Sequence, residues 1–364
     1  MDSVAMSGAR WLSSQDESAG PPVRSPCASS IVIENGFHFS LESKEESVTT
    51  RGGIRIGTIA VAALTTATLL LAGCSSTSSN GTSTTSAGST TGAAASGPVN
   101  VVASSNVWGD ITKQIGGEHV NVTSILSDPN ADPHEYEADA KTGAALSKAQ
   151  LVVENGLGYD DFMDKLLAAS PNANRTVLNA ADVMKISGSD ANPHIWYDIA
   201  KIPDVASAIA DQLGKLDPAD AGAFTANAKT FTDSLTPLTA GIDNIKAKYP
   251  GAPVGYTERV PGYLVEAAGL KLATPASFAQ SIEDGNDPSV ADNSAMDAAL
   301  TGKTIKVLLY NGQVTSPATD AVKQLAQSSG VPVVGVTETL PPTDKDFQAW
   351  QLRQINEITT ALGG

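Results

Sequence analysis

From Val99 to the C-terminus, short apolar segments alternate with segments whose apolar residues recur at helical spacing. This alternation is typical of βαβ units, in which the strands are parallel and helices cover the sheet. We therefore predict an α/β fold with mostly parallel sheets flanked by helices. The predicted strands are residues 99–103, 120–126, 151–153, 177–178, 254–257, 271–274, 305–310 and 331–336.

A long helical segment interrupts this alternation after Asp217-Pro218, a pair that favours a helix start. Apolar residues then recur every three or four positions, which predicts one helix over about 219–248 with a continuous apolar face. Pro237 and Gly241 lie inside it and predict a kink. Such a helix could run along two lobes or pack on a single domain. The apolar face comprises Phe224, Ala228, Phe231, Leu235, Leu238, Ile242 and Ile245.

The region before the predicted fold carries the features of a signal peptide. Arg51 and Arg55 precede an uncharged apolar segment at 56–72, and Leu71-Ala72-Gly73-Cys74 ends it. A positive segment, an apolar segment and small residues at the cleavage point occur in this order in secretory signals. Leu-Ala-Gly-Cys resembles a bacterial lipobox, which predicts lipidation of Cys74 as the processed N-terminus. An ordinary membrane anchor is the alternative.

Residues 1–50 form an extension of uncertain status, and a start codon placed too far upstream would explain it. Cleavage at Cys74 would discard Cys27, the other cysteine, and would leave no disulfide. The predicted parts of the chain are a lipoprotein signal peptide at 51–73, a Ser/Thr/Gly-rich tether at 74–97, an N-terminal lobe at 98–216, a linking helix at 217–249 and a C-terminal lobe at 250–364.

The chain is acidic, with a net charge of −16 over 364 residues. A field of this sign repels the phosphate backbone of nucleic acids, so a nucleic-acid partner is not expected. It suits the capture of cations, although such a charge also simply keeps proteins soluble. The sequence contains no P-loop, no Gly-x-Ser-x-Gly motif and no His-Glu-x-x-His motif.

Two of the four histidines directly follow a proline, and each comes after a predicted strand. These are His134, in Asp132-Pro133-His134-Glu135-Tyr136-Glu137, and His194, in Asn192-Pro193-His194-Ile195-Trp196-Tyr197-Asp198. Glu258 and Glu338 follow predicted strands in the second half of the chain. Ligands of open α/β sheets bind beyond the carboxyl ends of the strands, so these four residues predict a divalent-metal site. Polar loop histidines and a surface Glu258 are the alternatives.

From Val99 to Leu362 the chain resembles the solute-binding lipoproteins of bacterial ABC importers for zinc and manganese. The matching segments are ADPHEYE, ENGLGYDDFMDKLL, NPHIWYD, YTERVPGYLVEAAGL and VVGVTETLPP. The resemblance implies two α/β lobes joined by one long rigid helix, with a metal site in the cleft between the lobes. It also implies that His134, His194, Glu258 and Glu338 are the ligands. Glu338 replaces the usual aspartate, Val260-Pro261 replaces a common small-aromatic pair, and no histidine-rich loop is present.

The resemblance implies a receptor that captures Mn²⁺ or Zn²⁺ and delivers it to an ABC permease and its ATPase, and not an enzyme. We expect a monomer that is lipid-anchored at the outer face of the bacterial cytoplasmic membrane. A surface metal-binding adhesin and a metallohydrolase are the alternative functions. Two imidazoles and two carboxylates favour manganese slightly as the transported ion, while the intrinsic affinity order predicts tighter zinc binding in vitro.

Other polar residues have weaker predicted roles. We expect His119 to be a solvated turn residue, and Asn311 could donate hydrogen bonds to the ligands. Glu137 and Asp198 could orient the ligand histidines or could begin helices.

Overall fold

The computed structural model describes residues 97–129, 133, 136 and 140–364. His134, Glu137, Cys74 and all segments predicted before residue 97 lie outside the described residues.

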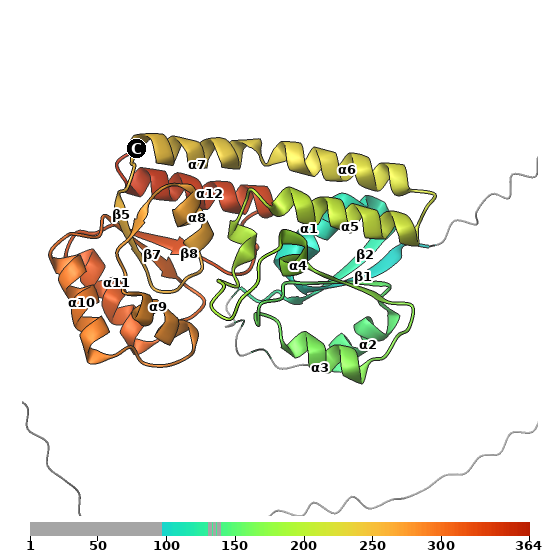
Figure 1. Ribbon diagram of the computed structural model, residues 1–364, viewed down its shortest axis with the longest axis horizontal. Helices are drawn as coiled ribbons and strands as arrows, with labels where there is room; N and C mark the ends of the chain where they lie inside the picture. The colour runs from blue at the N-terminus through green and yellow to red at the C-terminus, as the bar shows by residue number, and fades with distance from the viewer. Residues whose placement is uncertain (1–96, 130–132, 134–135, 137–139) are drawn as a thin grey trace, which may run out of the picture. The chain divides into compact units, whose positions relative to one another are not determined.

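Two four-stranded parallel sheets form the framework of one compact unit (Figure 1). The predicted α/β fold with parallel sheets is confirmed. Among the described residues, no helix is both long enough and apolar enough to span a membrane.

The first sheet has the strand order β2-β1-β3-β4, and β1 pairs with both β2 and β3. Its strands are β1 (Val99–Ser105), β2 (Val120–Leu126), β3 (Leu151–Glu154) and β4 (Thr176–Asn179). The helical elements of this half are α1 (Asn106–Gly116), η1 (Gly117–His119), α2 (Ala140–Lys148), α3 (Phe162–Ala169), α4 (Ala180–Met184), η3 (Ile195–Tyr197) and α5 (Ile202–Leu216).

The second sheet repeats this arrangement with the order β6-β5-β7-β8. Its strands are β5 (Pro253–Tyr256), β6 (Lys271–Leu272), β7 (Val307–Asn311) and β8 (Val333–Val336). Its helices are α8 (Gly262–Ala267), α9 (Ala276–Glu283), α10 (Val290–Thr301), α11 (Pro317–Ser328) and α12 (Phe347–Ala361). We call the parts built on the first and second sheets the first and second lobes.

The segment predicted as one kinked helix forms two consecutive helices, α6 (Ala221–Ser234) and α7 (Thr236–Lys248). The break is at Leu235, and Pro237 lies in the first turn of α7, where its missing N–H costs no helical hydrogen bond. All seven residues of the predicted apolar face are buried. Helix α6 contacts α1 and α5, whereas α7 contacts α8 and α12, so the pair runs along both lobes (Figure 1).

Gly241 has a different role from the predicted kink. A Cβ atom at this position would lie 2.7 Å from Cγ2 of Ile355. The glycine therefore lets α7 approach α12 closely, and α12 is the last helix of the second lobe.

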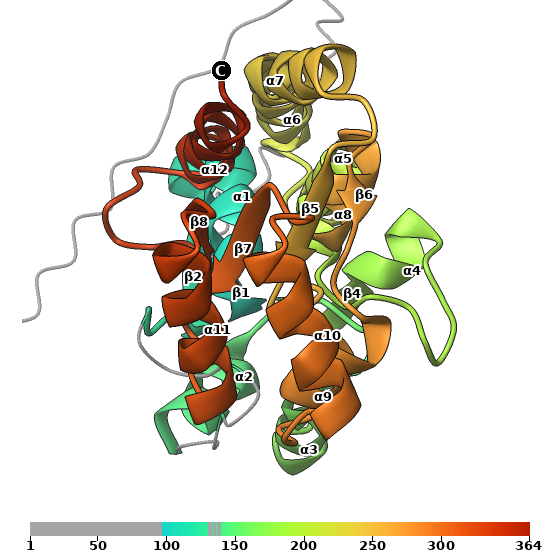
Figure 2. The same cartoon turned by 90° about the vertical axis from the view of Figure 1, so that its left-hand side faces the viewer.

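Alternating strand residues face different cores, as expected from the two-residue period of a strand. In the first sheet, Val102 and Val152 pack with residues of α2 and α3, while Val101 and Val153 belong to the main core. In the second sheet, Leu308 packs with residues of α9, α10 and α11, which cover the same side of that sheet in Figure 2. The other faces of both sheets share the main core, which also takes in α5, α6, α7 and α12.

Hydrogen bonds between the lobes reinforce this shared core. The Tyr197 hydroxyl donates to the carbonyl oxygen of Thr337 and lies 2.8 Å from Oε1 of Gln354. Asn106 exchanges two hydrogen bonds with the backbone of Leu340, at 2.8 and 2.9 Å. A rigid-body separation of the lobes would therefore expose apolar core and break several buried hydrogen bonds.

Candidate metal site

Three of the predicted ligands lie at one place between the two sheets. Glu258 follows β5 by two residues, and Glu338 follows β8 by two residues. Because β5, β7 and β8 are neighbouring parallel strands, their carboxyl ends lie at one edge of the second sheet. His194 comes from the connection between α4 and η3 in the first lobe. The site therefore lies where ligands bind in open parallel sheets.

The histidine and the two carboxylates converge in a buried position. Nε2 of His194 lies 3.5 Å from Oε2 of Glu338, and both side chains are fully buried. Glu258 is 1% exposed. Asn311, the last residue of β7, donates from Nδ2 to Oε2 of Glu258 and, at 2.7 Å, to Oε1 of Glu338. One side-chain amide thus holds both carboxylates.

Placing two carboxylates side by side in a buried environment requires a compensating positive charge or a proton. The charge of two ionised carboxylates and a neutral imidazole matches a divalent cation. A nitrogen donor with carboxylate oxygens is a set that zinc and manganese both accept. The arrangement can therefore hold a divalent transition metal.

Asn192 determines which nitrogen of His194 faces the carboxylates. Its Oδ1 accepts from the backbone N–H of His194 at 3.1 Å and lies 2.8 Å from Nδ1 of the same residue. Its Nδ2 donates to the backbone carbonyl of Arg259 at 2.7 Å, which fixes the orientation of the amide. Since Oδ1 can only accept, Nδ1 of His194 carries the proton. Nε2 then keeps its lone pair and points toward Glu338, as a metal ligand must.

Relatives of this chain are identified by sequence. A family model described as ZnuA, the periplasmic component A of a zinc-uptake complex, matches residues 101–361. The chain belongs to this family. It is 25% identical over 282 residues to the manganese-binding lipoprotein MntA of Bacillus subtilis, a match that covers 74% of this chain and 85% of MntA. It is 31% identical over 155 residues to PsaA of Streptococcus pneumoniae, a manganese ABC transporter substrate-binding lipoprotein. That match covers 38% of this chain and 49% of PsaA.

Solved structures of metal-binding proteins share the fold. The periplasmic zinc-binding protein TroA of Treponema pallidum matches with a TM-score of 0.62 and 20% identity, over 74% of this chain and all of TroA. The binding protein FpvC of Pseudomonas aeruginosa, solved with Mn²⁺, matches with a TM-score of 0.61 and 22% identity, over 73% of this chain and 98% of FpvC. Members of the family are solute-binding proteins of metal ABC transporters and not enzymes, which confirms both the resemblance and the prediction that this chain is not an enzyme.

The segment Asn155-Gly-Leu-Gly holds the backbone just before His194 in place. Nδ2 of Asn155 donates to the carbonyl oxygen of Pro193 at 2.9 Å, and its Oδ1 accepts from Nε1 of Trp108 at 3.2 Å. Asp160 closes the turn by accepting from the backbone N–H groups of Asn155 and Gly156 at 2.5 and 2.9 Å. Burial raises the pKa of Asp160. The motif therefore works as a support for the residue preceding His194.

Pro133 and Tyr136, which lie one residue before and two residues after His134, are described and lie close to Tyr159. Pro133 is buried, and the Tyr136 ring packs on Phe162 with a centroid distance of 4.6 Å. Pro133, Tyr136 and Tyr159 line one cavity of about 240 Å³. The Tyr159 ring in turn contacts the edge of His194, with a centroid distance of 5.9 Å.

Gln313 holds Glu338 by its backbone. Its Oε1 accepts from the N–H groups of Glu338 and Thr339 at 2.6 and 3.0 Å, and its Nε2 donates to Oγ1 of Thr339 at 2.8 Å. The sequence predicts Asn311 as a donor, but we predicted no role for Gln313 or Asn192. Two features of the sequence could have indicated them. Asn192 directly precedes the Pro-His pair, and Gln313 follows Asn311 by two residues at the end of a buried strand.

The proposed orienting role of Asp198 is wrong. Its carboxylate pairs with Lys201 at 3.8 Å, one turn further along the chain, whereas Nδ1 of His194 faces Asn192. The three residues of the η3 turn separate Asp198 from His194. The orienting group is therefore an amide and not a carboxylate.

A pair of charged residues lies at the entrance between the lobes. Arg259 donates from Nε and Nη2 to the carboxylate of Glu283 at 2.9 and 2.7 Å, and from Nη1 to the carbonyl of Asp190 at 3.2 Å. The Glu283 carboxylate raises the pKa of Arg259. The Tyr263 hydroxyl adds a bond to the carbonyl of Asn192 at 2.9 Å. We call Arg259, Glu283 and the Asp190 carbonyl the entrance latch, because it joins the lobes immediately beside Glu258.

Proposed function

We propose that this protein is the extracytoplasmic receptor of an ABC importer, which captures Mn²⁺ or Zn²⁺ and delivers it to a membrane permease driven by an ATPase. The convergence of His194 with two buried carboxylates from the other lobe carries this proposal. A permease partner is inferred from the family, whose relatives include proteins named as manganese ABC transporter substrate-binding lipoproteins.

The proposed ligand set is His134, His194, Glu258 and Glu338. The last three converge as described above. His134 is proposed as the fourth ligand from its Pro-His motif, because the flanking residues Pro133 and Tyr136 line a cavity together with Tyr159, whose ring touches His194. The metal is the cargo of the protein and not a resident cofactor.

Capture and release require a local opening. His194, Glu258 and Glu338 are buried, so an ion cannot reach them from solvent without a movement of nearby groups. A cavity of about 240 Å³ lies between the lobes, lined among others by Tyr159, Pro193 and Arg259. We propose that the ion passes this way when the entrance latch opens, while the shared core keeps the lobes together.

The choice between metals follows from the donors. Glu338 extends one methylene further than the aspartate usual in the family, and two carboxylates can supply more than two oxygen atoms. Manganese tolerates the resulting higher coordination number better than zinc does. We propose manganese as the transported ion and zinc as the tighter ligand in vitro, because the affinity order of divalent metals favours zinc.

The proposed location is the outer face of the cytoplasmic membrane, with a lipid anchor at Cys74 and residues 75–97 as a tether.

The experiment that tests the function is deletion of the gene, followed by measurement of ⁵⁴Mn and ⁶⁵Zn uptake under separate limitation of each metal. Loss of manganese uptake is expected. A defect in zinc uptake alone would overturn the metal choice, and unchanged uptake of both would overturn the receptor assignment.

A further inference from the structure

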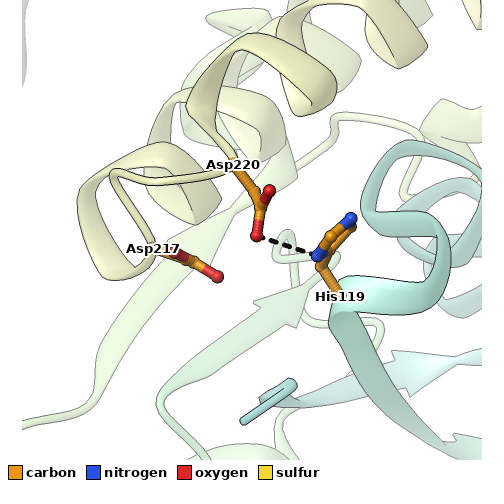
Figure 3. A group of neighbouring side chains, drawn as sticks. All are labelled: His119, Asp217 and Asp220. Carbon is orange, nitrogen blue, oxygen red and sulfur yellow. Dashed lines mark ion pairs between the residues drawn. The ribbon is translucent and has the colours of Figure 1, made fainter. Parts of the chain in front are cut away.

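A second group of metal-binding side chains lies in the first lobe, away from the site between the lobes (Figure 3). His119 ends η1, the turn between α1 and β2. Asp217 directly follows α5, and Asp220 directly precedes α6. One ligand atom from each residue lies within 4.8 Å of the other two. Two distant segments of the sequence thus place one imidazole and two carboxylates together.

Asp217 is the residue that points to a ligand. It is 5% exposed, and within the described part of the chain its carboxylate makes no hydrogen bond and no ion pair. Figure 3 shows this carboxylate directed toward the space beside Asp220 and His119. The fold removes most of the water from this side chain and, among the described residues, supplies no hydrogen-bond donor in its place, which is unfavourable for an ionised carboxylate. A cation in this space would supply the missing partner.

The other two residues are already held in position. Nδ1 of His119 lies 2.9 Å from Oδ2 of Asp220, and the His119 ring packs edge-on against Phe224 with a centroid distance of 5.9 Å. Asp220 is the N-cap residue of α6, yet its side chain makes no capping hydrogen bond. The helix terminus therefore does not account for its orientation. His119 lies in a turn, as expected from the sequence, and its side chain is 31% exposed.

The distances suit a six-coordinate ion after a small adjustment. Neighbouring ligands of an octahedral ion with bonds of about 2.1 Å lie about 3.0 Å apart. The separation of His119 and Asp220 is close to this value, so both could bind without moving apart. Asp217 would complete the set by approaching through side-chain rotation. The partly exposed imidazole and Asp220 leave room for water as the remaining ligands.

We propose that His119, Asp217 and Asp220 form a second divalent-metal site, distinct from the cargo site and occupied by a transition-metal ion. The imidazole favours zinc, copper, iron or nickel over calcium and magnesium, which prefer oxygen ligands. The ion would connect the turn before β2 with the corner between α5 and α6. It would therefore stabilise the start of α6, whose Asn227 also donates to the carbonyl of Ile115 in α1 at 3.0 Å.

The test is equilibrium dialysis of the full chain against Zn²⁺, with both cysteines alkylated so that thiols cannot bind the metal. We expect two equivalents for the native protein and one for Asp217→Asn. Asp211→Asn is the matched control, because Asp211 lies exposed on the neighbouring α5, and it should retain two equivalents. A single equivalent in the native protein, or two in Asp217→Asn, would overturn the proposal.

Two further variants separate this site from the cargo site. His119→Gln removes the nitrogen donor at a partly exposed position and should also bind one equivalent, which keeps the test valid if Asp217→Asn does not fold. Glu338→Gln should lose the cargo equivalent and keep the second one. In the Glu338→Gln protein, Zn²⁺ should still raise the melting temperature, and adding Asp217→Asn should abolish that rise. A rise that persists in the double variant would exclude this second site.

Discussion

Nε2 of His194 and Oε2 of Glu338 lie 3.5 Å apart, although the histidine belongs to the first lobe and the glutamate to the second. An ion bound between them would join the two lobes directly. The same connection is made without metal by Asn192, which bonds to His194 on one side and to the backbone of Arg259 on the other. Asn192 therefore links the imidazole that faces Glu338 to the backbone of the residue after Glu258.

The ligand set can be tested by removing one donor at a time. We expect His134→Ala, His194→Ala, Glu258→Gln and Glu338→Gln each to weaken metal binding by at least about tenfold, which corresponds to about 1.4 kcal/mol. Titration calorimetry on each variant measures this. Asp198→Asn is the control, because Asp198 is near His194 in sequence but pairs with Lys201. An unchanged affinity would remove the substituted residue from the ligand set.

Asn192 should act on affinity through the orientation of His194. Asn192→Ala removes the acceptor for Nδ1–H and the donor to Arg259, and loss of such a partner typically weakens metal binding about 10–100-fold. Asn192→Asp restores the acceptor but not the donor, so it should recover part of the affinity. ¹⁵N NMR of the imidazole reports the tautomer directly. If the alanine variant keeps the Nδ1–H tautomer and native affinity, the orienting role is wrong.

The entrance latch should control how fast the ion leaves. Arg259→Ala removes one hydrogen bond between the lobes, to the carbonyl of Asp190, and the two bonds to Glu283 that hold the guanidinium in place. It removes no metal ligand. We therefore expect faster release of bound metal to a chelator, measured by stopped flow. Arg353→Ala is the matched control, because Arg353 makes a similar ion pair with Asp344 away from the site. Equal acceleration in both variants would show a general loss of stability.

Metal loading should change the overall dimensions of the protein only slightly. Both sheets share one apolar core with α5, α6, α7 and α12, and opening a wide hinge would expose that core to water. Small-angle scattering of the metal-free and metal-loaded protein should give nearly equal radii of gyration. A large compaction on loading would contradict this expectation and would indicate hinge closure of the lobes.

Cys74 should carry the lipid anchor. Labelling of cells with palmitate should mark the native protein, and Cys74→Ala should abolish the label because the thiol is the acceptor. Cys27→Ala is the control, since Cys27 would be removed with the signal peptide. Equal labelling of native and Cys74→Ala protein would exclude the lipobox.

The regular part of the fold could be predicted from local patterns. All eight strands lie where apolar segments predict them. The central strands β1, β3 and β7 give the clearest signal, because a parallel strand buried on both faces needs apolar residues at consecutive positions. The break near Pro237 is also predicted, because proline is unfavourable inside a continuous helix but fits the first turn of a new one. Helix α5 was not predicted, although Ile202, Val205 and Ile209 recur at helical spacing. It begins only a few residues after the His194 segment and does not directly follow a strand, so the alternation of strands and helices did not indicate it.

The candidate site was only partly accessible to such reasoning. The Pro-His pairs and the positions after strands indicate His194, Glu258 and Glu338 as ligands, since local backbone constraints and strand ends are visible in the sequence. The sequence alone thus determined the fold class, the positions of the strands along the chain and the imidazole and carboxylate groups that follow them. Tertiary structure decided that Asn192 and not Asp198 orients His194, that Asn311 holds both carboxylates, and that His119 meets Asp217 and Asp220. These contacts join distant segments, and their geometry depends on how helices and sheets pack, which no local pattern encodes.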